Sequence, residues 1–283
     1  MTTRFGFNVP VRSRGSALTT IGLAALLAAV PAGAQDAGDH AQHDMGADSA
    51  TMDHSRHDMS PEMMAELREK IALYRDYTDQ QIMLSMQMMG ADYVSYVSDK
   101  SLSGDVGLLV LAHGFREAGD KRFAESMNEL SVVFPTAIGF GMAMMSSGHI
   151  QQAIDELEAA GAKTIIVIPA ASAPHNDLME QWEYIFGLRD EAAYATVPQV
   201  TSNAEIVMAE TPGDDPLVAE ILLDRALEIS EDPANEIVIV VAHGPTLEEH
   251  NQAELAMLET LAGYVREDGD FAERAVVPLG RPA

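Results

Sequence analysis

The stretch Gly107–Gly114 reads Gly-Leu-Leu-Val-Leu-Ala-His-Gly, an apolar run that stops abruptly at a histidine and a glycine. A second stretch, Ile237–Gly244, repeats the pattern and again ends in Ala-His-Gly. A short continuous apolar run bounded by glycine is typical of a strand that is buried on both faces. We therefore expect each run to be a central strand of a parallel sheet, with His113 and His243 at the strand ends.

The residues from 104 onward alternate between apolar runs and amphipathic helical patterns. This alternation predicts an α/β fold in which helices cover both faces of a parallel sheet. Further strands are expected over Ala137–Gly141, Lys163–Pro169, Glu205–Met208 and Ala275–Leu279, and helices over Gly119–Leu130, Ser146–Ala160 and Pro216–Ile229. We assign residues 104–230 to a first lobe and residues 231–283 to the start of a second, incomplete one.

Residues 61–100 are predicted to form a short helical segment that caps the first lobe. Ser60 is a good N-cap and Pro61 suits the first helical position. A second helix is expected over Asp79–Met89, whose methionines at three-residue spacing are interpreted as packing residues rather than as a copper site.

Residues 1–34 have the features of a secretory signal peptide. Basic residues precede Ala17–Val30, an apolar run of 14 residues that is too short to span a bilayer. The small residues Ala32-Gly33-Ala34 predict cleavage after Ala34. We therefore expect a periplasmic or secreted protein that has no membrane attachment after cleavage.

Residues 35–60 are rich in histidine, methionine and aspartate and lack large aliphatic residues, so we expect them to be disordered. Imidazole and thioether groups are ligands for copper, and the chain has no cysteine to compete with them. The segment is interpreted either as a weak metal site that includes His43, His54 and His57, or as an acidic linker. The formal net charge of −27 excludes nucleic acid and anionic membranes as partners.

Three histidines mark a candidate site in the α/β region. His113 ends one strand, and His175 follows the predicted strand Lys163–Pro169 with Asp177 and Glu180 close behind it. A right-handed β-α-β path brings the ends of both strands to the same edge of the sheet. Two imidazoles and a carboxylate can hold a divalent ion or remove protons near neutral pH. The alternative is that each histidine only satisfies backbone groups at a strand end.

The motifs Leu-Val-Leu-Ala-His-Gly, Ala-Lys-Thr-Ile-Ile-Val-Ile-Pro and Pro-His-Asn-Asp, in this order, resemble the class II chelatases. The closest branch is the CbiX-type sirohydrochlorin cobaltochelatase and ferrochelatase group. This resemblance implies flavodoxin-like lobes that enclose a tetrapyrrole, with Co²⁺, Fe²⁺ or Ni²⁺ as the metal substrate. It also implies that His113 and His175 bind metal and accept pyrrole protons, assisted by Glu117 or Glu180. His243 would repeat the first histidine in the second lobe.

Two features depart from that family. Phe115 and Pro245 stand where serine usually follows His-Gly. The second lobe stops after its second strand, which predicts either a fragment or a homodimer that covers an exposed apolar face. The alternative function is a non-catalytic periplasmic protein that binds or handles copper, cobalt or nickel.

Overall fold

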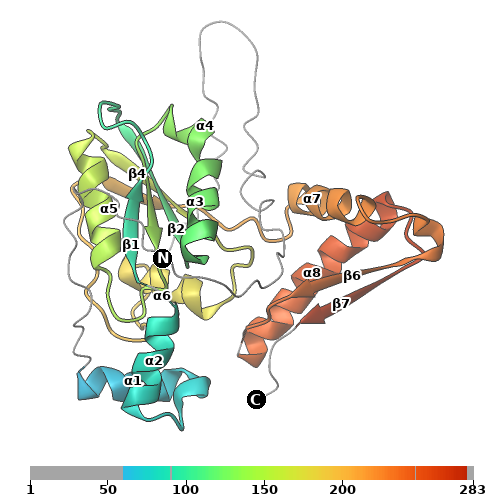
Figure 1. The fold of residues 1–283 in the computed structure, drawn as a ribbon, viewed down its shortest axis with the longest axis horizontal. Helices are drawn as coiled ribbons and strands as arrows, with labels where there is room; N and C mark the ends of the chain where they lie inside the picture. Colours follow the sequence, from blue (N-terminus) through green and yellow to red (C-terminus); the bar gives the residue numbers. More distant parts are fainter. Residues whose placement is uncertain (1–59, 90, 246, 279–283) are drawn as a thin grey trace, which may run out of the picture.

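The computed structural model describes residues 60–89, 91–245 and 247–278. Its centre is a five-stranded sheet with the strand order β1-β3-β2-β4-β5 (Figure 1). Strands β2, β3, β4 and β5 run parallel, whereas β1 is antiparallel to β3. The strands are β1 (Tyr93–Tyr96), β2 (Val106–Ala112), β3 (Thr136–Phe140), β4 (Thr164–Pro169) and β5 (Glu205–Met208). The predicted signal peptide and tail histidines lie outside the described residues and stay predictions.

Helices cover both faces of this sheet, as the alternating pattern predicted. One face packs against α3 (Arg116–Ser126) and α4 (Asn128–Ser131), and the other against α5 (Gly148–Ala159) and α6 (Asp177–Ile185). Successive side chains of β2 alternate between the two cores: Val110 belongs to the first, and Leu109 and Leu111 belong to the second. All three are fully buried, which explains the unbroken apolar run in the sequence.

The predicted helical segment caps the first lobe through a small core of its own. Helices α1 (Pro61–Lys70) and α2 (Asp79–Met89), joined through the short turn η3 (Ala72–Tyr74), pack against Met144, Tyr194 and Ala195. The Ser60 hydroxyl accepts a hydrogen bond from the Met63 amide at 3.2 Å and so caps α1 as expected.

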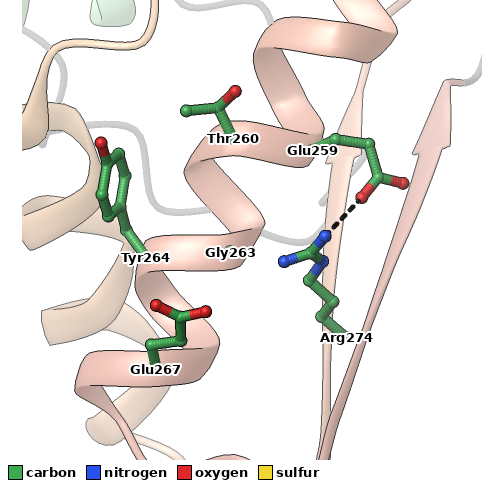
Figure 2. Close-up of a pocket in the computed structure, with 6 residues that line it drawn as sticks. All are labelled: Glu259, Thr260, Gly263, Tyr264, Glu267 and Arg274. Atoms are coloured by element: carbon green, nitrogen blue, oxygen red, sulfur yellow. Dashed lines mark ion pairs between the residues drawn. The ribbon is translucent and has the colours of Figure 1, made fainter.

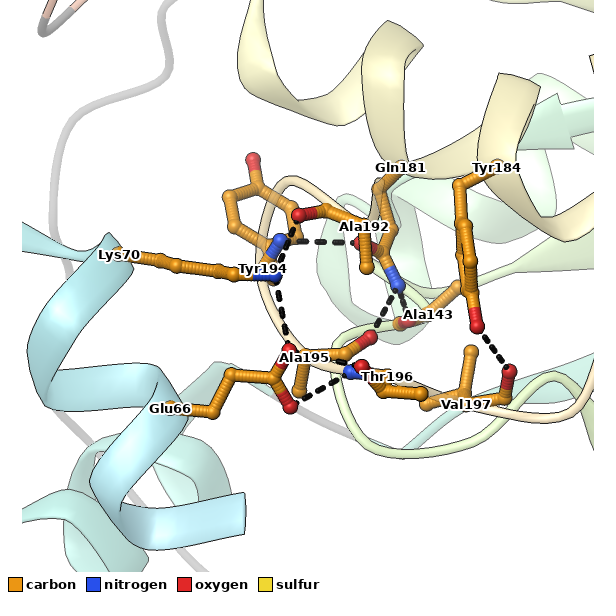
Figure 3. Close-up of polar contacts among 10 residues, drawn as sticks. All are labelled: Glu66, Lys70, Ala143, Gln181, Tyr184, Ala192, Tyr194, Ala195, Thr196 and Val197. Atoms are coloured by element: carbon orange, nitrogen blue, oxygen red, sulfur yellow. Dashed lines mark hydrogen bonds and ion pairs between the residues drawn. The ribbon is translucent and has the colours of Figure 1, made fainter. Parts of the chain in front are cut away.

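Polar contacts fix α1 to the loop that follows α6 (Figure 3). Glu66 accepts hydrogen bonds from both the amide and the hydroxyl of Thr196, each at 2.8 Å. Lys70 donates to the Ala192 carbonyl at 2.6 Å. The buried amide of Gln181 donates to the Ala143 and Ala195 carbonyls, which ties this loop to α6. These bonds set the position of α1 and, through it, of α2.

Residues 93–96 correct the prediction that residues 61–100 are helical throughout. The helix α2 ends at Met89, and Tyr93–Tyr96 pairs with β3 as an antiparallel edge strand. The Tyr93 ring stacks on Phe140 with centroids 5.0 Å apart. This non-local pairing, which the local sequence does not encode, determines the strand conformation.

One helix that was predicted to belong to the first lobe packs against the second. Helix α7 (Pro216–Leu227) packs with α8 (Glu248–Asp268) on the two-stranded parallel sheet β6 (Ile237–Ala242) and β7 (Glu273–Pro278) (Figure 1). Leu222 of α7 contacts the core formed by Val240, Leu258 and Ala262, whereas the predicted lobe boundary at residue 230 places α7 in the first lobe. That boundary stays a prediction. A 3₁₀ turn, η4 (Pro233–Asn235), leads into β6.

One face of the β6–β7 sheet is uncovered in the described part of the chain. Ile237, Ile239 and Val241 are each more than half exposed on it, whereas Val240 points into the core. The predicted apolar face is therefore present, and the homodimer that would cover it stays a prediction. Within residues 60–278, no described helix combines the length and the apolarity that a membrane span requires.

Candidate functional site

His113 lies where β2 ends, and its exposed side chain lines a cavity of about 550 Å³. The cavity has two walls from separate parts of the chain. One is the turn after β2 and the start of α3, which contribute Gly114, Arg116, Glu117 and Asp120. The other is the end of α2 and the start of β1, which contribute Gln87, Met88, Ala91 and Tyr93.

Asp120 holds the two walls together. It is buried, and its carboxylate accepts one hydrogen bond from the Phe115 amide and another from the Tyr93 hydroxyl, the latter at 2.8 Å. Burial, followed by the bond to Asp120, raises the pKa of Tyr93, so the hydroxyl stays a donor at neutral pH. Asp120 therefore positions the turn that carries His113.

Phe115 occupies the position after His-Gly where a serine was expected. Its ring lies 4.9 Å from the His113 ring and 5.5 Å from Phe123, measured between centroids. Gly119 makes this packing possible, because a methyl group there would lie 2.5 Å from the Phe115 Cβ. Gly119 is thus a position that needs a small residue. It lies inside α3, which begins at Arg116, so the prediction that the helix begins at Gly119 is wrong.

His175 and Glu180 lie apart from this cavity. His175 is exposed in the loop between β4 and α6, and neither residue belongs to the cavity lining. Parallel pairing of β2 with β4 does bring both strand ends to one edge of the sheet, as the topology predicted. Glu180 forms an ion pair with Arg189, and its carboxylate lies 3.3 Å from the His250 ring. Of the two acids proposed to assist the histidines, Glu117 is the one beside His113.

His250 is a residue that the sequence did not reveal. It lies in the first turn of α8, and its ring reaches α6 of the first lobe, 3.6 Å from Asp177 and 3.3 Å from Glu180. Its side chain is only 15% exposed. Nothing local distinguishes this histidine, because its acidic partners lie some 70 positions earlier in the chain. It joins the two lobes next to the loop that carries His175.

His243 ends β6 as predicted but does not line the His113 cavity. Its Nδ1 lies 3.0 Å from the Gly244 carbonyl, as expected for a histidine that satisfies the backbone at a strand end. Glu254 of α8 is close enough for the two charges to interact: burial raises the pKa of Glu254, and His243 opposes that shift.

In the described residues, no three histidine or acidic side chains converge to enclose a metal ion. His113 with Glu117 offers at most an imidazole and a carboxylate, both exposed. An ion at such a place keeps most of its coordination positions open for a ligand.

A second cavity, of about 340 Å³, lies along α8 and β7 of the second lobe (Figure 2). Arg274 of β7 forms an ion pair with Glu259 at 3.2 Å, and its guanidinium passes close over Gly263. No histidine lines this cavity, so it lacks the imidazole that metal binding and proton transfer at the His113 cavity would use.

A half-buried acid lies at the same edge of the first sheet, in the loop before β1. The Asp92 carboxylate accepts hydrogen bonds from the Met142 and Ala143 amides and lies 3.7 Å from the buried His149 ring of α5. Gly141, with φ +134°, is required beside it because a methyl group would lie 2.0 Å from the Asp92 Oδ1. Burial raises the pKa of Asp92 from 3.8 to about 7, although the two amide bonds oppose the shift.

Asp92→Asn is expected to be more stable than the unaltered protein at pH 8, by about 1–3 kcal/mol. A raised pKa means that the folded state binds the proton more tightly than the unfolded chain does. The unaltered protein therefore loses stability as pH rises from about 4 to about 7, and asparagine removes this loss. Urea denaturation of both proteins from pH 4 to pH 8 measures the difference. A difference that does not change with pH would contradict the assignment.

Comparisons with known proteins match the segment of the chain that carries His113. The model of the CbiX family matches residues 107–229, which include His113 and His175. The chain is 30% identical over 141 residues to the sirohydrochlorin cobaltochelatase of Methanothermobacter thermautotrophicus, and the alignment covers 45% of this chain and 95% of that protein. The wall formed by α2 and the start of β1 lies outside the segment that the family model matches.

Proposed function

Because this chain belongs to the CbiX family, we propose that it is a metal chelatase that inserts a divalent ion into a tetrapyrrole. The observation that carries the proposal is the position of His113, at the end of a central strand and in an open cavity within the matched segment. The substrate would be sirohydrochlorin or a similar macrocycle, as the name of the relative suggests. Co²⁺, Fe²⁺ or Ni²⁺ would be the metal substrate.

Metal insertion requires the protein to remove protons from the macrocycle and to deliver the metal ion. Insertion replaces two pyrrole N–H protons by one divalent ion, so two protons must leave. A neutral imidazole can accept a proton near pH 7, and His113 is exposed to receive it and pass it to solvent. The ion must also be delivered with open positions, so that pyrrole nitrogens can replace its other ligands. Imidazole and carboxylate ligands from His113 and Glu117 satisfy that requirement.

The direct test mixes the purified protein with sirohydrochlorin and Co²⁺, Fe²⁺ or Ni²⁺ in turn and follows the absorbance change on insertion. We expect at least one ion to be inserted well above the rate without protein. If no ion is inserted faster than in the protein-free control, while calorimetry detects metal binding, the chelatase proposal fails. The non-catalytic metal-binding function then replaces it.

A further inference from the structure

Arg116 stands out among the cationic side chains of this acidic chain. Eight of the twelve lysines and arginines in the described residues form ion pairs with carboxylates. Arg116 is exposed and forms no ion pair with a described residue. Lys121 and Arg122 of the same helix also lack an ion pair within the described part of the chain, but only Arg116 lines the His113 cavity. The cavity therefore contains an unpaired guanidinium beside its histidine.

The backbone at Arg116 is held in an unfavourable conformation. Its φ is +64°, in the left-handed region that residues with a Cβ rarely adopt. The surrounding turn enforces it, because Asp120 binds the Phe115 amide and the Phe115 ring packs against His113 and Phe123. Backbone strain of this kind persists where neighbouring contacts over-determine it, and it is common at ligand sites. Here it keeps Arg116 in the wall of the cavity.

We propose that Arg116 is a specificity-determining residue of this site, whose guanidinium binds a carboxylate of the ligand that occupies the His113 cavity. This inference rests on the proposed function and assigns the residue that selects acidic ligands at that site. A guanidinium donates paired, charge-assisted hydrogen bonds to a carboxylate, and these favour acidic ligands over neutral or cationic ones of the same shape. Met88 and Ala91, in the opposite wall, offer apolar surface to the body of such a ligand.

Binding of metal-free uroporphyrin, which carries eight carboxylates, tests the inference without any turnover. We expect Arg116→Gln to weaken binding about tenfold in a fluorescence titration at low ionic strength, since a charge-assisted bond to a carboxylate is lost. Arg116→Gly should weaken it similarly while relieving the backbone strain, so a folding defect cannot explain both results. Arg122→Gln removes the same charge from the same helix outside the cavity and should bind as the unaltered protein does.

A second experiment changes the charge of the ligand instead of that of the protein. A porphyrin of similar size with cationic side arms should bind the Arg116 variants at least as well as the unaltered protein. Equal losses in Arg116→Gln and Arg122→Gln would show a general charge effect and overturn the inference, as would no binding of uroporphyrin by the unaltered protein. Metal insertion with normal binding by Arg116→Gln would overturn the inference and leave the chelatase proposal standing. If only the Arg116 variants lose binding and the unaltered protein inserts no metal, the inference stands and the chelatase proposal fails.

Discussion

Replacing His113 with alanine is expected to lower the rate of metal insertion at least about 100-fold, because the variant loses both a metal ligand and a proton acceptor. The side chain is exposed, so the free energy of unfolding should change by less than about 0.5 kcal/mol. Initial rates with sirohydrochlorin and the preferred ion, together with urea denaturation, measure the two effects separately. A lost rate in a protein of unchanged stability would assign the loss to chemistry.

A matched control for this variant is Lys163→Ala. Lys163 precedes β4 at the opposite end of the sheet, where it is exposed and pairs with Asp105. Its loss should leave the rate unchanged. His175→Ala then tests the predicted pair of histidines, since a pair that acts together requires a loss comparable with that of His113→Ala. A normal rate for His113→Ala would contradict the proposed site as a whole.

Trp182→Ala is expected to lower the free energy of unfolding by about 4 kcal/mol. Trp182 of α6 is fully buried and is the largest side chain in the core that joins α6 to α5 and the sheet. Alanine would leave a large cavity that a close-packed core fills only in part. Because this tryptophan is the only one in the chain, circular dichroism rather than fluorescence should follow unfolding in urea.

Trp182→Phe is the matched comparison. The indole Nε1 is buried and has no hydrogen-bond partner among the described residues, so phenylalanine removes no bond and retains most of the apolar volume. We expect its loss of stability to be less than half that of Trp182→Ala. Equal losses in both variants would mean that the indole nitrogen, and not the core volume, carries the effect.

The parts of the fold that the sequence predicted correctly depend on local pattern. The central strands β2 and β4 are buried on both faces, so each appears as an unbroken apolar run, and glycine marks where β2 ends. The cap of α1 was recognisable because Ser60 directly precedes Pro61, and its hydroxyl accepts the Met63 amide as expected. Each of these signals lies within a few residues of the feature that it predicts.

The errors arose where contacts distant in sequence decide the structure. Tyr93–Tyr96 is a strand because β3 lies beside it. The packing of α7 against the second-lobe core is likewise not encoded in the sequence of α7 alone. His113 was predicted from its strand, but the wall formed by Met88 depends on the docking of α1 at Thr196. The left-handed backbone of Arg116 likewise follows from the buried Asp120 and cannot be read from the residue itself.

The thin core of the second lobe has a consequence for how the molecule opens. The central cluster of this lobe has only three buried residues, Val240, Leu258 and Ala262. The first sheet is packed between two larger clusters of buried residues. Regions with few buried apolar contacts exchange their amide hydrogens through local openings that cost less than global unfolding. The amides of β6 and β7 should therefore exchange earlier than those of β2 and β4. The two His-Gly strands, alike in sequence, would then differ in how long they keep their amide protons.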